Sequence, residues 1–328
     1  MCEPGFNAPV HLDVTPRPLN FSPVAADWLR DILPDLFLTS IEKADGVTVP
    51  AEAGYYRLTL ANGQLLFAKV KTGDRAAKEA KAAVLSSTLN QLGAASLAPE
   101  RGQVRSDNGL SVFVYPWIEE VFYDESLEGI TSLGKSLAHL HMRMRELPGQ
   151  TDRQRHLFDI WEGRLALTSD LPFADDYRRL LAAVGESFAR EASQIAHNDI
   201  HRGNVLFDAS KVAAFIDFED AIDTVSSPLV DISASLERFC LLPEASEEKV
   251  RAFLASYATN SGGLVAATAH EIAQVGLCRC YNALAILELS RAPDNPLWQA
   301  ERRKFISLLE KWRRWEQIIA LGLQSLRI

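Results

Sequence analysis

Apolar runs with the spacing of β-strands gather in the first third of the chain. Residues 55–60 and 65–71 are two such runs, and Asn62-Gly63 lies between them. Because Asn-Gly favours the tight primed turns, these segments predict a β-hairpin. Residues 110–115 form a third run, in which aromatic and valine side chains alternate. We therefore expect a sheet in this part of the chain.

Two helices are predicted beside these strands. Ser22-Pro23 has the signature of a helix start and precedes apolar residues at helical spacing in 28–33. Asp74 is a potential cap for a second helix, which runs to about Gly93. The apolar side of this second helix consists of Val84, Leu85, Leu89 and Leu92.

From Ser132 onward the pattern is predominantly helical and begins with a clear apolar stripe. The stripe consists of Leu133, Leu137, Leu140 and Met144. His141 lies on or beside this stripe, so we expect a hydrogen-bonded core histidine rather than a ligand. Later helices are expected at 155–168, 175–192, 229–240, 246–259, 267–290 and 298–324.

Pro116 ends the third strand and marks a hinge between these two patterns. We expect an α+β fold with a strand-rich N-terminal lobe at residues 1–117 and a mostly helical C-terminal lobe at 118–328. Residues 1–20 lack periodicity and are expected to form an extended arm.

The densest cluster of polar candidates lies in the stretch 195–219. A polar loop that contains His197, Asp199, His201 and Asn204 is followed by two short apolar runs joined by a turn, and Asp217 ends the second run. Two carboxylates and a carboxamide are thus expected on loops that strands hold in place, where catalytic groups are commonly found.

The spacing H-x-D-x-x-x-x-N, followed by a strand and I-D-F, matches the catalytic loop and the metal-binding aspartate of the kinase signature. Asp199 is positioned to accept a hydroxyl proton, and Asn204 and Asp217 offer the hard oxygen ligands that Mg²⁺ prefers. Lys69 lies on a predicted strand with apolar neighbours and can reach nucleotide phosphates, with Glu79 as its partner. Lys71 points to the same face, but its flanks are less apolar.

The composition is that of an ordinary soluble globular protein, with 328 residues, 47% hydrophobic and 23% charged. A net charge of -9 argues against a general nucleic-acid-binding protein. The N-terminus has no leader-like pattern and no apolar run approaches the length of a membrane span, so we expect a cytoplasmic protein without membrane binding. The four cysteines, Cys2, Cys240, Cys278 and Cys280, are expected to be free thiols.

Taken in order, these motifs resemble the aminoglycoside phosphotransferase and choline kinase-like family, which are small-molecule kinases with the protein-kinase fold. The matching segments cover about residues 50–240. They are LLFAKV around Lys69, KEAKAAVLSSTL around Glu79, LGKSLAHLH at 133–141, HNDIHRGNVLF at 197–207, IDFEDA at 216–221 and SPLVDIS at 227–233.

The resemblance implies a catalytic base at Asp199, Mg²⁺ ligands at Asn204 and Asp217, and ATP or GTP as co-substrate held by Lys69 with Glu79. It further implies that adenine binds at the hinge near 113–117. The nucleotide-binding candidates there are Tyr115 and Trp117, and Gly54 belongs to a candidate phosphate-covering loop. Asp231 resembles a structural aspartate that steadies the catalytic loop. Arg202 stands where the family often has proline, and its charge suggests a different acceptor.

Three functions are compatible with these residues. The first is a kinase, monomeric or homodimeric, that phosphorylates a hydroxyl of a small polar molecule such as an aminoglycoside, an amino alcohol or a sugar. The acids Glu219, Asp220 and Asp223 would suit a cationic acceptor, while hydrogen bonds would suit a neutral one. The second is a kinase-fold binding or regulatory protein with weak catalysis. The third is a metallohydrolase with His197, Asp199 and His201 as ligands.

Overall fold

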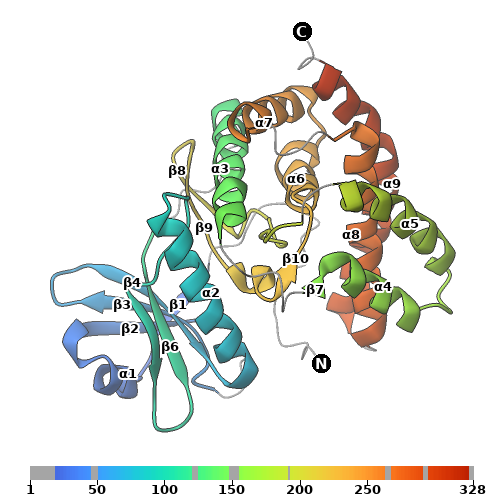
Figure 1. The fold of residues 1–328 in the computed structure, drawn as a ribbon. Coiled ribbons are helices and arrows are strands. Elements are labelled where there is room, and N and C mark those ends of the chain that lie inside the picture. Colours follow the sequence, from blue (N-terminus) through green and yellow to red (C-terminus); the bar gives the residue numbers. More distant parts are fainter. Residues whose placement is uncertain are drawn as a thin grey trace.

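The computed structural model of the chain describes residues 19–45, 51–119, 125–147, 155–190, 193–262, 267–290 and 295–324. These residues form a strand-rich lobe and a helical lobe, as the α+β prediction required (Figure 1). The arm predicted at 1–20 lies outside the described residues except for its last two positions. The lobe boundary at residue 117 stays a prediction.

The N-terminal lobe is built on an antiparallel sheet with the strand order β1-β2-β3-β4-β6-β5. Its strands are β1 (Phe21–Pro23), β2 (Leu38–Ala44), β3 (Gly54–Leu60), β4 (Leu65–Lys71), β5 (Arg101–Arg105) and β6 (Ser111–Pro116). A short helix α1 (Asp27–Ile32), a 3-10 turn η1 (Pro34–Leu36) and the long helix α2 (Gly73–Gln91) complete the lobe.

The two faces of the sheet bury different side chains because successive residues of a strand point to opposite sides. One face packs against α1 and η1 in a core that includes Val112 and Val114. The other face bears Phe113 and Tyr115, which pack near α2. The register places Lys69 opposite Phe113, so Lys69 lies on this second face.

The predicted hairpin is confirmed as β3 and β4, but its turn differs from the prediction. Only Gly63 of the Asn62-Gly63 pair has a positive φ (+82°), and the Leu60 N–H donates to the Gln64 carbonyl (2.9 Å). In a primed two-residue turn the two central residues alone would connect the paired strands, but here residues 61–63 lie between the paired Leu60 and Gln64. A three-residue loop with glycine in the left-handed position forms here instead.

Both predicted helix starts in this lobe were misplaced. Ser22-Pro23 belongs to the edge strand β1, where a missing proline N–H costs no ladder hydrogen bond, and the helix begins at Asp27. The helix α2 begins at Gly73, after Thr72, so Asp74 lies in its first turn rather than capping it. Its predicted apolar side is only partly correct, because Val84 is 67% exposed while Leu85 and Leu89 are buried.

The C-terminal lobe is a helical assembly with two short β-ribbons. Its elements are α3 (Leu127–Glu146), β7 (Arg155–His156), α4 (Leu157–Leu167), α5 (Ala174–Arg190), β8 (Val205–Asp208), β9 (Lys211–Phe215), the 3-10 helix η2 (Phe218–Ala221), β10 (Thr224–Val225), α6 (Leu229–Ser235), the π-helical segment η3 (Leu236–Leu241), α7 (Glu247–Asn260), α8 (Ala269–Ser290) and α9 (Pro296–Gln324). The helices predicted from Ser132 onward all form. The first of them starts earlier than expected, because Ser126 caps it by accepting a hydrogen bond from the Gly129 N–H (3.0 Å).

One large apolar core joins this lobe to α2. The core contains the stripe of α3 and also Leu85 and Leu89 of α2, so the helix that carries Glu79 is anchored in the C-terminal lobe. Backbone hydrogen bonds between Phe215 of β9 and the segment that follows α2 join the lobes at a second place. Elements of both lobes are thereby held around the space between them.

The helices α8 and α9 pack against each other through a glycine. The indole of Trp312 lies over Gly276, where any Cβ would overlap the ring. Length and composition alone would allow α8 to cross a membrane, contrary to the expectation that no segment approaches that length, yet half of the relevant stretch is buried within the protein. Cys240, Cys278 and Cys280 are buried free thiols, as predicted.

Candidate active site

The loop between α5 and β8 is held in place by a buried carboxylate. Asp231, in the first turn of α6, accepts hydrogen bonds from the backbone N–H groups of His197 and Asn198 (2.7 Å each). Its Oδ2 also lies 3.0 Å from Nε2 of His141, whose Nδ1 is 2.8 Å from the Tyr257 hydroxyl. The geometry agrees with the structural role expected for Asp231 and with the prediction that His141 is a hydrogen-bonded core residue.

Asp199 lies on this loop with nearly half of its side chain exposed (46%). The Asn204 side-chain amide donates to Oδ2 and to the backbone carbonyl of Asp199 (3.0 and 2.9 Å). This leaves the carboxamide oxygen of Asn204 for another partner. Because Oδ1 of Asp199 is not used in this interaction, the carboxylate keeps an oxygen that can accept a proton.

The charge of Asp199 is stabilised by its surroundings. Burial raises the pKa of this carboxyl, and His201, whose Nε2 is 3.6 Å away, acts against that effect. His197 and Arg279 contribute further in the same direction, and the pKa lies below its usual range. Asp199 is therefore an ionised acceptor at neutral pH.

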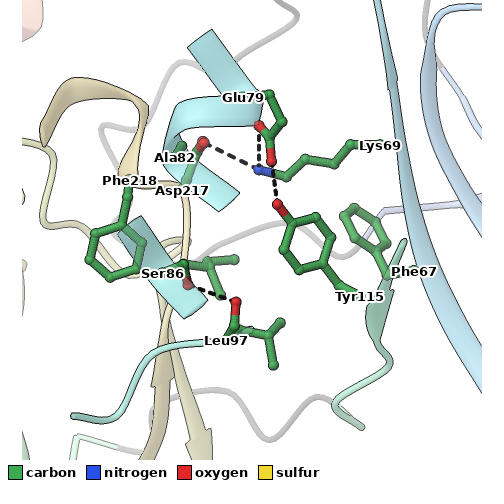
Figure 2. Close-up of a pocket in the computed structure, with 10 residues that line it drawn as sticks. Phe67, Lys69, Glu79, Ala82, Ser86, Leu97, Tyr115, Asp217 and Phe218 are labelled. Atoms are coloured by element: carbon green, nitrogen blue, oxygen red, sulfur yellow. Dashed lines mark hydrogen bonds and ion pairs between the residues drawn. The ribbon is translucent and has the colours of Figure 1, made fainter. Parts of the chain in front are cut away.

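Lys69 and Glu79 form the predicted pair, and Figure 2 shows them with Asp217 and Tyr115. The Lys69 ammonium is 3.1 Å from Glu79 Oε2 and 3.3 Å from Asp217 Oδ1. The Tyr115 hydroxyl donates to the other oxygen of Glu79 (2.6 Å). Lys69 and Glu79 are both buried. Their ion pair and the contact of Lys69 with Asp217 join β4, α2 and the end of the β8–β9 hairpin.

A second lysine, which the sequence reasoning set aside, joins the same cluster. The Lys71 ammonium lies 2.9 Å from Glu79 Oε2 and also pairs with Glu219. The i, i+2 spacing of the two lysines on β4 was the signal, since such residues share a face. Glu79 therefore faces two ammonium groups rather than one.

The protonation states follow from these contacts. Burial alone lowers the pKa of Lys69, but the carboxylates of Asp217 and Glu79 outweigh it and raise that pKa above its ordinary value. Burial raises the pKa of Glu79, and the charges of Lys69 and Lys71 outweigh it, so this pKa lies below its ordinary value. Lys69 and Glu79 are both charged at neutral pH.

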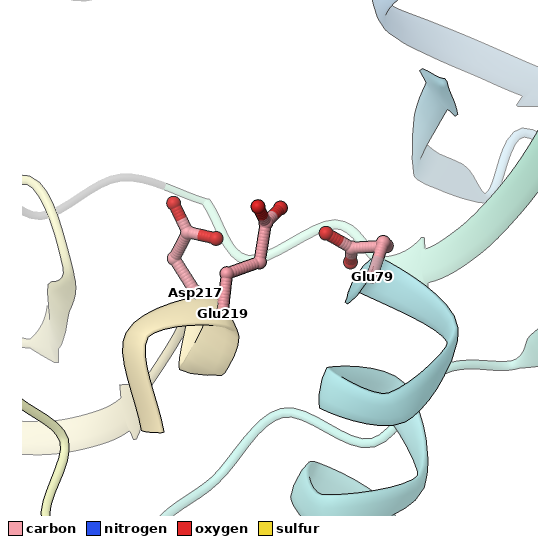
Figure 3. Close-up of side chains that lie close together, drawn as sticks. All are labelled: Glu79, Asp217 and Glu219. Atoms are coloured by element: carbon pink, nitrogen blue, oxygen red, sulfur yellow. The ribbon is translucent and has the colours of Figure 1, made fainter. Parts of the chain in front are cut away.

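Oxygen ligands gather at the end of the hairpin. Carboxylate oxygens of Glu79, Asp217 and Glu219 lie within 4.8 Å of one another, and Figure 3 shows these side chains pointing toward a common space. Asp217 takes a left-handed φ of +66°, and Asn204 is nearby in the backbone because its carbonyl accepts from the Ile216 N–H (3.0 Å). Because Glu79 and Glu219 pair with lysines, the hard-oxygen donors that fit Mg²⁺ here are Asp217 and Asn204.

The hairpin-to-η2 segment also carries the acids that pair with the N-terminal lobe. We call Glu219, Asp220 and Asp223 the η2 acids and Lys71, Lys78 and Lys81 the lysine row. In addition to the Lys71–Glu219 pair, Lys78 is 2.8 Å from Asp220 and Lys81 is 2.7 Å from Asp223. Each of these acids thus has a lysine of the other lobe as a partner, and the choice between a cationic and a neutral acceptor stays a prediction.

Arg202 also differs from its expected role. Its guanidinium is buried and donates to the backbone carbonyls of Arg238 (2.7 Å) and Leu242 (3.1 Å) and to Glu125 (3.0 Å). These contacts tie the catalytic loop to η3. Arg202 is a structural residue in this fold rather than a group that contacts an acceptor.

The other nucleotide-binding candidates lie on β3 and at the end of β6. Gly54 is the first residue of β3 and pairs with Val70, with a φ of +139°. The Trp117 ring packs against Phe21 and Phe67, with ring centroids 5.7 and 6.4 Å apart. The candidate covering loop, Glu52 to Tyr56, consists of the end of a turn and the start of β3, and the Tyr56 hydroxyl donates to the Glu52 carbonyl (2.5 Å).

The metallohydrolase geometry does not form. The His197 ring packs on Phe218 (4.8 Å between centroids), and its Nε2 is 2.9 Å from the Ile216 carbonyl. This nitrogen is used by the backbone and cannot converge with Asp199 and His201 on a metal. Within the described residues, the side chains that bring potential metal-ligand atoms together are those of Glu79, Asp217 and Glu219.

A pocket that opens to solvent lies between β4, α2 and the end of the hairpin (Figure 2). Its walls are mostly apolar, and its polar groups are those of the lysine–glutamate pair, Asp217 and their neighbours. The lining residues are Phe67, Lys69, Glu79, Ala82, Ser86, Leu97, Tyr115, Ile216, Asp217 and Phe218.

A strand lysine paired with a helix glutamate, an aspartate–asparagine loop and an aspartate at a hairpin end together define a kinase-like protein. Residues 51–263 match the model of the phosphotransferase enzyme family, to which the chain belongs. No curated protein sequence matches the chain.

Solved structures with the same fold are distant in sequence. An aminoglycoside phosphotransferase from Alicyclobacillus acidocaldarius is 16% identical, with a TM-score of 0.60 over 94% of this chain and 98% of that one. The macrolide 2'-phosphotransferase of Brachybacterium faecium is 15% identical, with a TM-score of 0.60 over 86% and 97%. A spectinomycin phosphotransferase in complex with ADP and spectinomycin is 13% identical, with a TM-score of 0.57 over 94% and 100%. These likenesses confirm the kinase-like fold.

Proposed function

We propose that the protein transfers the γ-phosphoryl group of ATP or GTP to a hydroxyl of a small polar molecule. The observation that carries this proposal is the convergence of Lys69, Glu79 and Asp217, with 3.1 and 3.3 Å contacts, beside the loop of Asp199 and Asn204. Membership of a phosphotransferase family supports the reaction type. Neighbours of the same fold with bound GDP or ADP support a nucleotide co-substrate.

In the proposed reaction the acceptor hydroxyl lies against Asp199. Its oxygen attacks the γ-phosphorus, the bond between that phosphorus and the β-phosphate oxygen breaks, and the hydroxyl proton passes to Asp199. Ionised Asp199, held by Asn204, orients the hydroxyl and receives this proton. The nucleoside diphosphate is the leaving group.

Lys69 provides the cation for the nucleotide phosphates, and Glu79 holds its ammonium in place. Asn204 and Asp217 would hold Mg²⁺, which neutralises negative charge on the phosphates when it is bound. Tyr115, through its hydrogen bond, keeps the Glu79 carboxylate turned toward Lys69. These side chains thus act by positioning the nucleotide and by stabilising the negative charge of its phosphates.

The test is nucleotide turnover across a panel of hydroxyl compounds, with Asp199→Ala, Asp217→Ala and a control, Asp208→Ala. Asp208 is an exposed carboxylate at the end of β8 in the same hairpin. Asp199→Ala should lower turnover by about 10³-fold or more, while the nucleotide affinity stays nearly unchanged, because the base acts on the acceptor. Asp217→Ala should weaken Mg²⁺–nucleotide binding as well.

The control should retain full activity. Near-wild-type turnover of Asp199→Ala on the preferred acceptor would show that another group receives the proton, and the proposed mechanism would be wrong.

A further inference from the structure

The η2 acids are turned toward the N-terminal lobe. The η2 acids all pair with the lysine row of the N-terminal lobe, so their charge is neutralised at the contact between the lobes. On the helical side, charged groups near the catalytic loop include the Arg202–Glu125–Lys249 contacts and a second cluster on η3 and α8.

Two arginines there share one carboxylate. Glu237 is buried, and its Oε1 lies 2.9 Å from Nε of Arg238, while its Oε2 lies 3.7 Å from Nη1 of Arg279. The indole N–H of Trp312 also donates to Oε2 (2.8 Å). Although they are within ion-pair distance, these two arginine nitrogens are buried and have no hydrogen-bond acceptor. Within this cluster the one negative charge of Glu237 thus faces two positive charges.

This arginine pair is connected to the catalytic loop. Arg202, three residues after Asp199, donates its Nε–H to the carbonyl of Arg238 (2.7 Å). The charge of Arg279 also acts on Asp199, since it contributes to the lowered pKa of that carboxyl after the effects of burial and His201. Both arginine side chains keep part of their surface exposed, 15% for Arg238 and 20% for Arg279.

We propose that the acceptor carries an anionic group, a carboxylate or a phosphate, which binds Arg238 and Arg279 while the acceptor hydroxyl lies at Asp199. This inference rests on the proposed phosphoryl transfer and names its substrate class. A guanidinium binds carboxylate or phosphate through two parallel hydrogen bonds. A polycationic acceptor would bring ammonium groups toward two arginines that already exceed their one counter-charge, and like charges brought together disfavour binding.

The first test compares acceptors in matched pairs with Mg²⁺ and ATP or GTP. Glycerate is compared with glycerol, glucose 6-phosphate with glucose, and homoserine is included as a zwitterion. Kanamycin and spectinomycin serve as cationic probes. We expect kcat/KM to be at least about tenfold higher for the anionic member of a pair than for its neutral counterpart, as a charge-assisted hydrogen bond would give. The carboxylate and phosphate members show which anion the site prefers.

The second test removes one positive charge. Arg279→Gln should raise KM for the preferred anionic acceptor by about 10- to 100-fold and leave KM for the nucleotide unchanged. Arg303→Gln, a substitution of an exposed arginine on α9, is the matched control and should change neither constant. Arg238→Gln provides an independent variant if Arg279→Gln fails to fold, which thermal unfolding will show.

Titration calorimetry with glycerate, glucose 6-phosphate and kanamycin, in the presence of Mg²⁺ and a non-hydrolysable nucleotide, measures binding without turnover. Failure of both anionic compounds to bind or react, or a preference for kanamycin, overturns the inference. If transfer to a cationic acceptor is still lost in Asp199→Ala, only the substrate class is wrong. If transfer is unaffected in Asp199→Ala, the proposed mechanism itself is wrong.

Discussion

Replacing Asp231 by asparagine tests how the catalytic loop is held. The shape of the side chain is kept, but one carboxylate oxygen becomes an amide NH₂. The better orientation keeps the bonds to His197 and His141 and turns the NH₂ toward the Asn198 N–H, which loses its acceptor. One charge-assisted hydrogen bond is lost and its half-buried N–H donor is left without this acceptor, at a combined cost of about 1.5–3 kcal/mol.

We therefore expect the free energy of unfolding to fall by about 1.5–3 kcal/mol, which corresponds to a Tm lower by roughly 2–5 °C, because the unfolding entropy grows with the length of the chain. The kcat should fall as well, because the loop that carries Asp199 loses its fixed position. The assays are thermal unfolding, denaturant unfolding and steady-state turnover. Asp208→Asn, an exposed substitution in the β8–β9 hairpin, is the control.

The pH dependence supplies a second check. Burial raises the pKa of Asp231, but the hydrogen bond and charge of His141 and the contacts with His197 outweigh it, so the folded-state pKa is lowered. A lowered carboxyl pKa stabilises the fold above the unfolded value of about 3.9, and this stability is lost as the pH falls through the folded-state value. The difference in stability between wild type and Asp231→Asn should thus be constant from about pH 8 to 5 and shrink below about pH 4. A difference no larger than that of the control between pH 8 and 5 would refute the reasoning.

Two further substitutions test weaker contacts. Tyr115→Phe removes the hydrogen bond to Glu79 (2.6 Å). Turnover should fall by about tenfold, which corresponds to roughly 1.4 kcal/mol, with little change in Tm. Unchanged turnover would show that Glu79 does not need this hydrogen bond. The double variant Lys78→Ala/Lys81→Ala removes two exposed ion pairs between the lobes. Each pair contributes about 1 kcal/mol or less, so Tm should fall by only a few degrees, and by less in 1 M salt. A large, salt-independent loss in thermal unfolding would contradict this estimate.

Local patterns in the sequence predicted the parts of the fold that local physics determines. The alternation in 110–115 correctly placed β6, because side chains on both faces of that strand are buried. Helices with long periodic stripes, such as α3, were found for the same reason. Ser22-Pro23 was wrong because a proline signal is the same at a helix start and on an edge strand, and only pairing with β2 distinguishes them.

The site required contacts that no local pattern encodes. Lys69 and Glu79 lie 10 residues apart and could be paired through the order of motifs, but Lys71 and Glu219 meet across 148 residues. The sequence therefore suggested that Glu219 was available to an acceptor, whereas tertiary structure assigns it to the opposite lobe. Sequence reasoning missed Arg279, because the effect of its charge on Asp199 depends on how α8 packs in the C-terminal lobe.

The packing of Trp312 on Gly276 has a consequence for acceptor choice. Gly276 lies one helical turn before Arg279 on α8, and the same indole that fills its space donates to Glu237, the shared partner of the two arginines. The close approach of α8 and α9 thus depends on the lack of a side chain at Gly276. Adding a methyl group at position 276 would displace the helix, the indole and the arginine together. Acceptor preference in this protein would then be tunable from a buried helix–helix contact, through substitutions that touch neither nucleotide nor acceptor.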